Sequence, residues 1–308
     1  MADKPQTFIA VETGPFSGAT LLALLVSAHP GIATVGEMNG LIAKENPETY
    51  LCSCGRRIRD CAFWAALAAA MGRRGFEFDV ARFDLSFIPR MSRVGYYLRL
   101  GSLRHARLDS LRDRIIESLP VERRRLTALV ARNEAFIESV FETAGGHVFL
   151  DTSKDRLRLR TMRRFSTLDV KVIHLVRDVR GVVASLVRRG RDLDAREAAR
   201  QWVKLHERIE VGLSGLPAAT VIRIRYEDVC RDTASTLRRV WEFCGVDPNA
   251  GASADLRGSP QHLVGNQMRL NNLLEIRIDE RWRSLLTVDQ LRQVEAVAGP
   301  LSRQFGYA

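Results

Sequence analysis

Residues 7–28, TFIAVETGPFSGATLLALLVSA, decide the fold that this sequence predicts. The short apolar run at 7–13 is typical of a buried strand, and the density of Leu and Ala at 19–28 is typical of a buried helix. A tight loop of Gly, Pro and Ser joins the two. Because the first amides of a helix are unpaired and carry partial positive charge, this loop predicts an anion-binding site.

The residues of the loop refine that prediction. Gly14 and Gly18 let the backbone approach a ligand closely, and Ser17 and Thr20 can add hydroxyl donors. The pattern G-x-x-x-x-G-K-[ST] of enzymes that hydrolyse ATP or GTP is not met, because Ala19 follows Gly18 where lysine is required. A purely structural strand-to-helix turn is the alternative interpretation.

The rest of the chain alternates strand and helix patterns. Further strands are expected near 147–151, 170–176 and 220–226, with helical patterns between or after them. This alternation predicts an α/β fold of three layers, with a mostly parallel central sheet flanked by helices. We expect one domain over residues 1–308, with a helical insertion at about 65–140.

Composition limits the classes of function. Lys and Arg outnumber Asp and Glu by 47 to 36, and the formal charge of +11 favours anionic partners. The arginines are scattered and aromatic residues make up 7%, which argues against a nucleic-acid binder. The N-terminus lacks the layout of a signal peptide and no apolar run could span a bilayer, so we expect a cytoplasmic protein.

A second motif lies at 172–190, VIHLVRDVRGVVASLVRRG. It places Arg177 at the end of a predicted strand and Ser185 inside the following helix. Both side chains can converge on one phosphate, because the guanidinium fork donates two parallel bonds to phosphate oxygens. A surface ion pair between Arg177 and Asp178, beside an ordinary helical serine, is the alternative.

Together these motifs resemble the two cofactor signatures of sulfotransferases that use 3′-phosphoadenosine-5′-phosphosulfate (PAPS). The resemblance is carried by PFSGATLL (15–22) with HP and GE downstream, VRDVRGVVASLV (176–187), FLDTSK (149–154), RIRYEDV (223–229) and HLVGNQMR (262–269). CSCGRRIRDCAFW (52–64) looks like a segment of many bacterial members. The order and spacing match over most of the chain, apart from 65–140.

The resemblance implies a P-loop-like fold and transfer of a sulfonate group from PAPS to an acceptor hydroxyl or amine. It assigns the 5′-phosphosulfate to Pro15, Phe16, Ser17, Gly18, Ala19 and Thr20. It assigns the 3′-phosphate to Arg177 and Ser185, and the neighbourhood of the adenine to Tyr226. Arg269 would close over the 3′-phosphate in a loop ordered by His262 and Asn266.

One position departs from the family pattern. Phe16 stands where the family usually has Arg or Lys, so either another cation replaces it or activity is lost. Lys154, after the strand at 147–151, is the candidate replacement.

Transfer also needs a group that takes up the proton released by the acceptor hydroxyl or amine. Glu37 has this role by resemblance; Asp151 is the alternative, and His29 and His206 are expected to be structural.

Three cysteines raise the question of a metal. Cys52, Cys54 and Cys61 are one ligand short of a structural zinc site, and the sequence does not identify a fourth. Packing and redox-labile thiols are the other interpretations. The family's chemistry requires no metal, so none is expected as a cofactor.

Two other classes of function stay open. One is a small-molecule kinase with an unusual phosphate loop, which would bind ATP with magnesium. The other is a protein without activity, such as an inactive nucleotide-binding homologue.

The acceptor of a sulfotransferase would be a small molecule, a lipid or a carbohydrate. The basic, aromatic stretch at 89–108 favours an acidic, sugar-like or aromatic acceptor. The sequence does not predict the oligomeric state.

Overall fold

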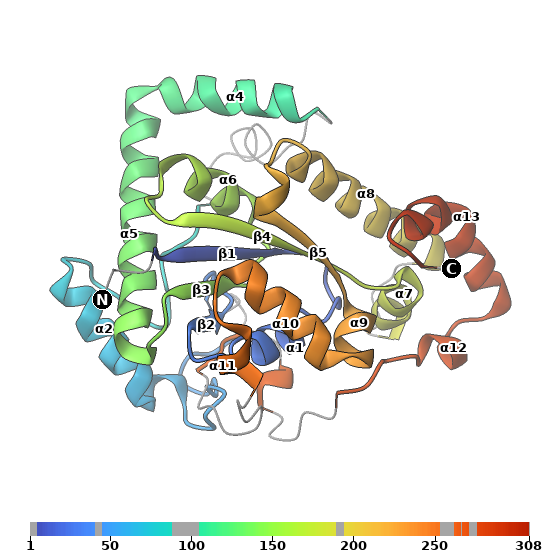
Figure 1. Cartoon of the computed structure of the whole chain (residues 1–308), viewed down its shortest axis with the longest axis horizontal. Helices are drawn as coiled ribbons and strands as arrows, with labels where there is room; N and C mark the ends of the chain where they lie inside the picture. The colour runs from blue at the N-terminus through green and yellow to red at the C-terminus, as the bar shows by residue number, and fades with distance from the viewer. Residues whose placement is uncertain are drawn as a thin grey trace.

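The centre of the molecule is a parallel β-sheet. The computed structural model describes residues 5–40, 45–87, 105–188, 194–252, 262–265, 267–270 and 276–307. Within these ranges five strands form one sheet in the order β2-β3-β1-β4-β5, and every pairing is parallel (Figure 1). The strands are β1 (Thr7–Glu12), β2 (Ile32–Gly36), β3 (Val148–Asp151), β4 (Asp169–Val176) and β5 (Val221–Arg225).

The central strand β1 is apolar on both sides. Phe8 and Ala10 pack into the core on one face of the sheet, and Ile9 and Val11 pack into the core on the other. Successive side chains of a strand point to opposite faces, so an uninterrupted apolar run is what a strand covered on both faces requires. The sheet is therefore the middle of three layers, as predicted.

Helices cover both faces of this sheet. One core contains β1, α1 and α10, a second contains α2, α5 and α6, and a third joins α7, α8, α12 and α13 at one end of the molecule (Figure 1). The helices are α1 (Ala19–Val26), α2 (Ala62–Arg73), α4 (Ala106–Ser118), α5 (Pro120–Ala144), α6 (Arg156–Phe165), α7 (Val179–Arg188), α8 (Ala195–Leu213), α9 (Tyr226–Arg231), α10 (Thr233–Cys244), α11 (Pro248–Ala252), α12 (Trp282–Leu285) and α13 (Val288–Gln304). Short 3-10 helices are η1 (Ile58–Asp60), η2 (Ala218–Thr220) and η3 (Gln267–Leu270).

The four strands expected from the sequence are confirmed, but β2 was not predicted. Its five residues follow the Pro30–Gly31 turn directly, and a run this short carries little periodic signal. The insertion predicted at about 65–140 contains α4 and most of α2 and α5. Whether the chain is one domain with an insertion stays a prediction.

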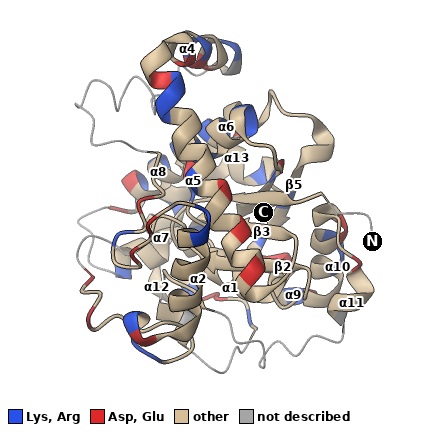
Figure 2. Ribbon diagram, turned by 90° about the vertical axis from the view of Figure 1, so that its left-hand side faces the viewer, with Lys and Arg blue, Asp and Glu red and all other residues tan. Residues whose placement is uncertain are grey.

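Helix α4 lies apart from the sheet and carries charges of both signs (Figure 2). Ion pairs connect it to α6: Asp113 lies 3.4 Å from Arg160, and Glu117 lies 2.6 Å from Arg164.

No helix in the described ranges is both long enough and apolar enough to cross a membrane.

Candidate active site

A cleft opens at the carboxyl ends of the strands, where ligands bind in parallel α/β sheets. Its volume is about 930 Å³. Its walls come from both ends of the chain: the loop after β1, the residues that follow β2, β3, β4 and β5, helix α7, and the segment at 276–281. The lining includes Gly14–Leu21, Glu37, Lys154, Arg177, Ser185, Arg188, Tyr226, Met268 and Arg277–Arg281.

The loop after β1 has a backbone that depends on glycine. Gly18 immediately precedes α1 and has φ 87°, in the left-handed region. A Cβ atom at Gly18 would lie 2.4 Å from the ring of Tyr226. Phe16 also has a positive φ of 59°. The loop thus brings its backbone close to Tyr226 and leads directly into the amino end of α1, where unpaired amides can meet an anion.

Arg177 reaches this same loop from the end of β4. Its Nη1 donates a hydrogen bond of 2.7 Å to the carbonyl oxygen of Phe16. The guanidinium lies over the ring of Tyr226, 4.6 Å from its centre, and the residue is buried. A Cβ atom at Gly181 would lie 3.0 Å from the arginine Nε, so the glycine leaves room for the guanidinium. The loop at 14–20 and Arg177 therefore line one cleft, as the sequence predicted.

The other residues predicted to contact a nucleotide are placed as follows. Ser185 lines the cleft from α7, but its hydroxyl donates to the carbonyl of Gly181 at 2.8 Å. Tyr226 lies beneath Arg177 at the start of α9. Arg269 belongs to η3, but its side chain lies outside the described residues, as does Asn266.

Glu37 and Lys154 meet in the cleft. Glu37 follows β2 and Lys154 follows β3, so the pairing of these two strands brings both to the same edge. Lys154 Nζ donates to Glu37 Oε1 at 2.9 Å, and each side chain is 28% exposed. The loop at 14–20 has no Lys or Arg, but Lys154 places a cation elsewhere in the same cleft. This cation contacts Glu37, the carboxylate predicted to act as a base.

The alternative proton acceptors are engaged elsewhere. Asp151 is buried and accepts hydrogen bonds from Arg158 Nη1 at 3.0 Å and from the Ser153 amide at 2.9 Å. His29 contacts the carbonyl of Asp247 at 2.8 Å, outside the cleft lining. His206 lies outside the cleft lining with its Nδ1 3.0 Å from His174 Nε2, and burial lowers its pKa to about 3.

The segment at 276–281 was missed by the sequence analysis. Asp279 Oδ2 lies 3.2 Å from Arg177 Nη2, and Asp279 Oδ1 accepts from Arg281 Nε at 2.6 Å. The hydrogen bond from Arg281, followed by the charge of Arg177, holds the pKa of Asp279 well below its usual range. An acidic residue between arginines is too common a pattern for the sequence alone to have assigned it to this site.

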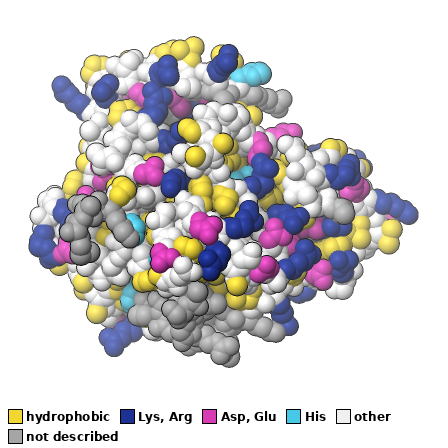
Figure 3. Space-filling model, viewed as in Figure 1, with side chains coloured by type: hydrophobic (Ala, Val, Ile, Leu, Met, Phe, Trp, Pro, Cys, Tyr) yellow, Lys and Arg dark blue, Asp and Glu magenta, His cyan; other side chains and the backbone are white. Residues whose placement is uncertain are grey.

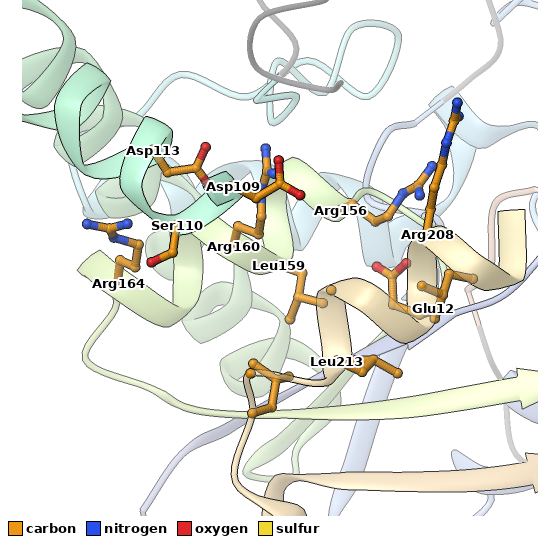
Figure 4. A pocket seen from close by; sticks show the side chains of 14 residues that line it. Glu12, Asp109, Ser110, Asp113, Arg156, Leu159, Arg160, Arg164, Arg208 and Leu213 are labelled. Atoms are coloured by element: carbon orange, nitrogen blue, oxygen red, sulfur yellow. Dashed lines mark ion pairs between the residues drawn. The ribbon is translucent and has the colours of Figure 1, made fainter. Parts of the chain in front are cut away.

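A second cavity, of about 200 Å³, lies between α4, α6 and α8 (Figure 4). Glu12 points into it toward Arg156 and Arg208 (Figure 4). Within the described part of the chain, Glu12 Oε1 has no hydrogen-bond partner. Burial raises the pKa of Glu12 to about 8, against the opposing effect of the nearby Arg156. None of the described residues lines both this cavity and the cleft.

Comparison with known proteins identifies the class to which this site is similar. Residues 159–249 match the model of the sulfotransferase family. The match covers Arg177, Ser185 and Tyr226, although not the loop at 14–20. The resemblance inferred from the motifs is thereby confirmed. A comparison with curated proteins finds no match.

Several solved sulfotransferase structures are similar to the chain. The sulfotransferase domain from the curacin biosynthetic pathway is 17% identical, with 100% of this chain and 99% of that one covered and a TM-score of 0.47. The sulfotransferase domain of the Synechococcus PCC 7002 olefin synthase is 20% identical, with 97% of each chain covered and a TM-score of 0.47. A mouse sulfotransferase complexed with 3′-phosphoadenosine-5′-phosphate (PAP) is 12% identical, with 98% of this chain and 86% of that one covered and a TM-score of 0.43.

Proposed function

We propose that the protein is a sulfotransferase that takes a sulfonate group from PAPS and transfers it to a hydroxyl or amine of a small-molecule, lipid or carbohydrate acceptor. One observation carries the proposal. The glycine loop at the start of α1 and the buried guanidinium of Arg177 line one cleft, and the Glu37–Lys154 pair lies in that same cleft. The family match over residues 159–249 supports the same class.

A nucleotide with an anionic group at each end fits the two binding elements. The amides that begin α1 would hold the 5′-phosphosulfate, because they combine free donors with the positive end of the helix. Arg177 would hold the 3′-phosphate through its planar fork, with Ser185 beside it on α7. The bond from Arg177 to the Phe16 carbonyl ties the two elements together, which supports one ligand spanning both.

The chemistry follows from positions in the cleft. Glu37 would accept the proton of the acceptor hydroxyl or amine while the acceptor atom forms a bond to sulfur. The bond between sulfur and the 5′-phosphate oxygen breaks in line, and 3′-phosphoadenosine-5′-phosphate (PAP) leaves. Lys154 would supply the positive charge that Phe16 cannot, near the transferred group and the negative charge that develops on the leaving 5′-phosphate oxygen.

Calorimetry tests the donor site. We expect PAP to bind far more tightly than AMP, and more tightly than ATP with magnesium. Arg177→Ala should weaken PAP binding roughly 10- to 150-fold, because a charged hydrogen bond contributes about 1.5–3 kcal/mol. Arg200→Ala, on the exposed side of α8, is the matched control and should retain the affinity. Equal affinity for AMP and PAP would rule out a 3′-phosphate site, and tighter binding of ATP with magnesium would favour a kinase.

Activity is tested with PAPS that carries an isotopically labelled sulfonate group. The enzyme is incubated with a metabolite pool, and mass spectrometry searches for labelled products. Appearance of the label in an acceptor would establish transfer and identify the acceptor. Tight binding of PAP with no labelled product from diverse pools would instead indicate an inactive homologue.

A further inference from the structure

Four potential metal ligands that are distant in the sequence come together beside the cleft. Cys52, Cys54 and Cys61 lie in the segment between β2 and α2, and His262 arrives from the C-terminal third of the chain. Their three Sγ atoms and one imidazole nitrogen all lie within 4.8 Å of one another. The sequence alone leaves the three cysteines one ligand short, because nothing along the chain indicates which distant residue joins them.

The separations of these atoms are close to those of a metal tetrahedron. With zinc bonds of about 2.3 Å to sulfur and 2.0 Å to nitrogen, tetrahedral edges measure about 3.8 Å between sulfurs and about 3.5 Å between sulfur and nitrogen. Cys54 Sγ lies 3.6 Å from Cys61 Sγ. His262 Nδ1 lies 3.2 Å from Cys61 Sγ and 3.6 Å from Cys52 Sγ. Only small shifts would bring all four atoms to bonding distance from one ion.

The surrounding contacts hold the ligands in place. The amide of Cys52 donates to the carbonyl of Arg56 at 2.8 Å, which closes a tight turn around Cys54. Gly55 takes the left-handed conformation that this turn needs, with φ 83°. The imidazole of His262 stacks on the ring of Phe63, with 4.4 Å between ring centres. Contacts beyond the ligands that fix their orientation are typical of metal sites.

We propose that Cys52, Cys54, Cys61 and His262 bind one Zn²⁺ ion. Thiolate and imidazole ligands in a tetrahedral arrangement select zinc over harder cations such as magnesium. All four positions come from the protein, so the ion has no open position for a substrate and its role is structural. This proposal does not depend on the sulfotransferase activity.

The ion would fasten one wall of the cleft. Two residues after His262, the amide of Val264 donates to the carbonyl of Val35 at 2.9 Å, beside β2. At the next residue, a Cβ on Gly265 would lie 3.4 Å from Glu37 Cγ. Tyr50 adds a further connection, because its hydroxyl accepts from the amide of Gly265 at 2.9 Å. Zinc would thus hold the C-terminal segment against β2 and Glu37.

Metal analysis of the full-length protein, purified without a polyhistidine tag or chelator, tests the proposal. We expect about one zinc ion per chain. After zinc removal, Co²⁺ should give the visible absorption of a tetrahedral thiolate site. Cys54→Ala and His262→Ala should lose the metal, whereas His262→Cys should keep it as a site of four cysteines. Cys54 is the exposed cysteine of the set, so replacing it leaves core packing intact.

Cys230→Ala is the matched control, since this cysteine lies on α9 outside the cluster and its variant should retain zinc. The proposal is overturned if the wild-type protein contains no zinc and takes up neither Zn²⁺ nor Co²⁺. It is also overturned if zinc persists in both Cys54→Ala and His262→Ala. A disulfide between Cys54 and Cys61 in freshly purified protein would assign the cluster to redox chemistry instead. None of these readouts involves PAPS, so they separate this proposal from the proposed function.

Discussion

Arg177 depends on small neighbours as much as on its own charge. Its guanidinium fits between the Tyr226 ring and α7 because position 181 has no side chain. The Tyr226 ring in turn fits against the loop because Gly18 has none. Gly18, Arg177 and Tyr226 were predicted from the sequence as members of the site, but Gly181 was not, because its importance depends on where the guanidinium packs. The contacts of Tyr226 with Arg177 and with the loop at Gly18 are likewise visible only in the fold.

Glu37 is the residue whose substitution tests the chemistry most directly. Glu37→Gln keeps the shape of the side chain but removes its ability to accept a proton. We expect turnover with an identified acceptor to fall about 10²- to 10⁴-fold, with unchanged affinity for PAP. Steady-state kinetics and calorimetry on the same preparation measure both quantities.

Glu48→Gln is the control for that substitution, because Glu48 is exposed and pairs with Arg59 outside the cleft. Its turnover should match that of the wild-type protein. An undiminished rate in Glu37→Gln would remove Glu37 from the role of base and leave it only as the partner of Lys154.

Among the elements, the segment at 276–281 has the most direct effect on the proposed donor site. It places the carboxylate of Asp279 on the guanidinium that would bind a phosphate. A bound phosphate would have to displace this carboxylate or be repelled by it. Asp279→Asn should therefore tighten PAP binding about three- to tenfold, as measured by calorimetry.

Asp289→Asn changes the net charge equally and is the matched control, since Asp289 is exposed on α13 and pairs with Arg292. Its affinity for PAP should equal that of the wild-type protein. Weaker binding in Asp279→Asn would mean that the carboxylate supports Arg177 rather than competing with the ligand.

Elements with strong local patterns were predictable, and those defined by distant contacts were not. The apolar runs of β1 and β4 fix them as buried strands whatever surrounds them. Strand β2 is only five residues long, and its register follows from pairing with β3, which lies more than a hundred residues later. The ion pair between Glu37 and Lys154 depends on that pairing. Both residues were predicted from the sequence as candidate site residues, but their direct contact was not.

For the whole molecule, Glu12 makes stability depend on pH. Its pKa is raised to about 8 in the folded protein, because burial disfavours the charged carboxylate. Between the ordinary pKa and 8, the unfolded chain releases a proton that the folded chain keeps, so stability falls as pH rises through this window. The loss is at most about 5 kcal/mol. Denaturant unfolding of Glu12→Gln at pH 5 and pH 8.5 should show a smaller decrease than in the wild-type protein.

Glu207→Gln provides the comparison, since Glu207 is exposed on α8 and its removal should leave the wild-type pH dependence unchanged. An equal decrease in Glu12→Gln and the wild-type protein would show that other groups cause it.

The surplus of positive charge is distributed over the surface. On the face seen in Figure 3, basic side chains of the described residues alternate with acidic and apolar ones. Many arginines are paired, as in the contacts of Arg74 with Glu138 and Glu142. The net charge of +11 followed from the sequence, but which arginines remain available to a ligand is decided by this pairing.

The cleft joins parts of the chain that are synthesised at different times. Residues 14–20 leave the ribosome well before Arg277–Arg281, and both segments line the cleft. A nascent chain that has not yet reached residue 277 therefore lacks one wall of the cleft, and we expect the proposed donor site to form only after this wall has been translated.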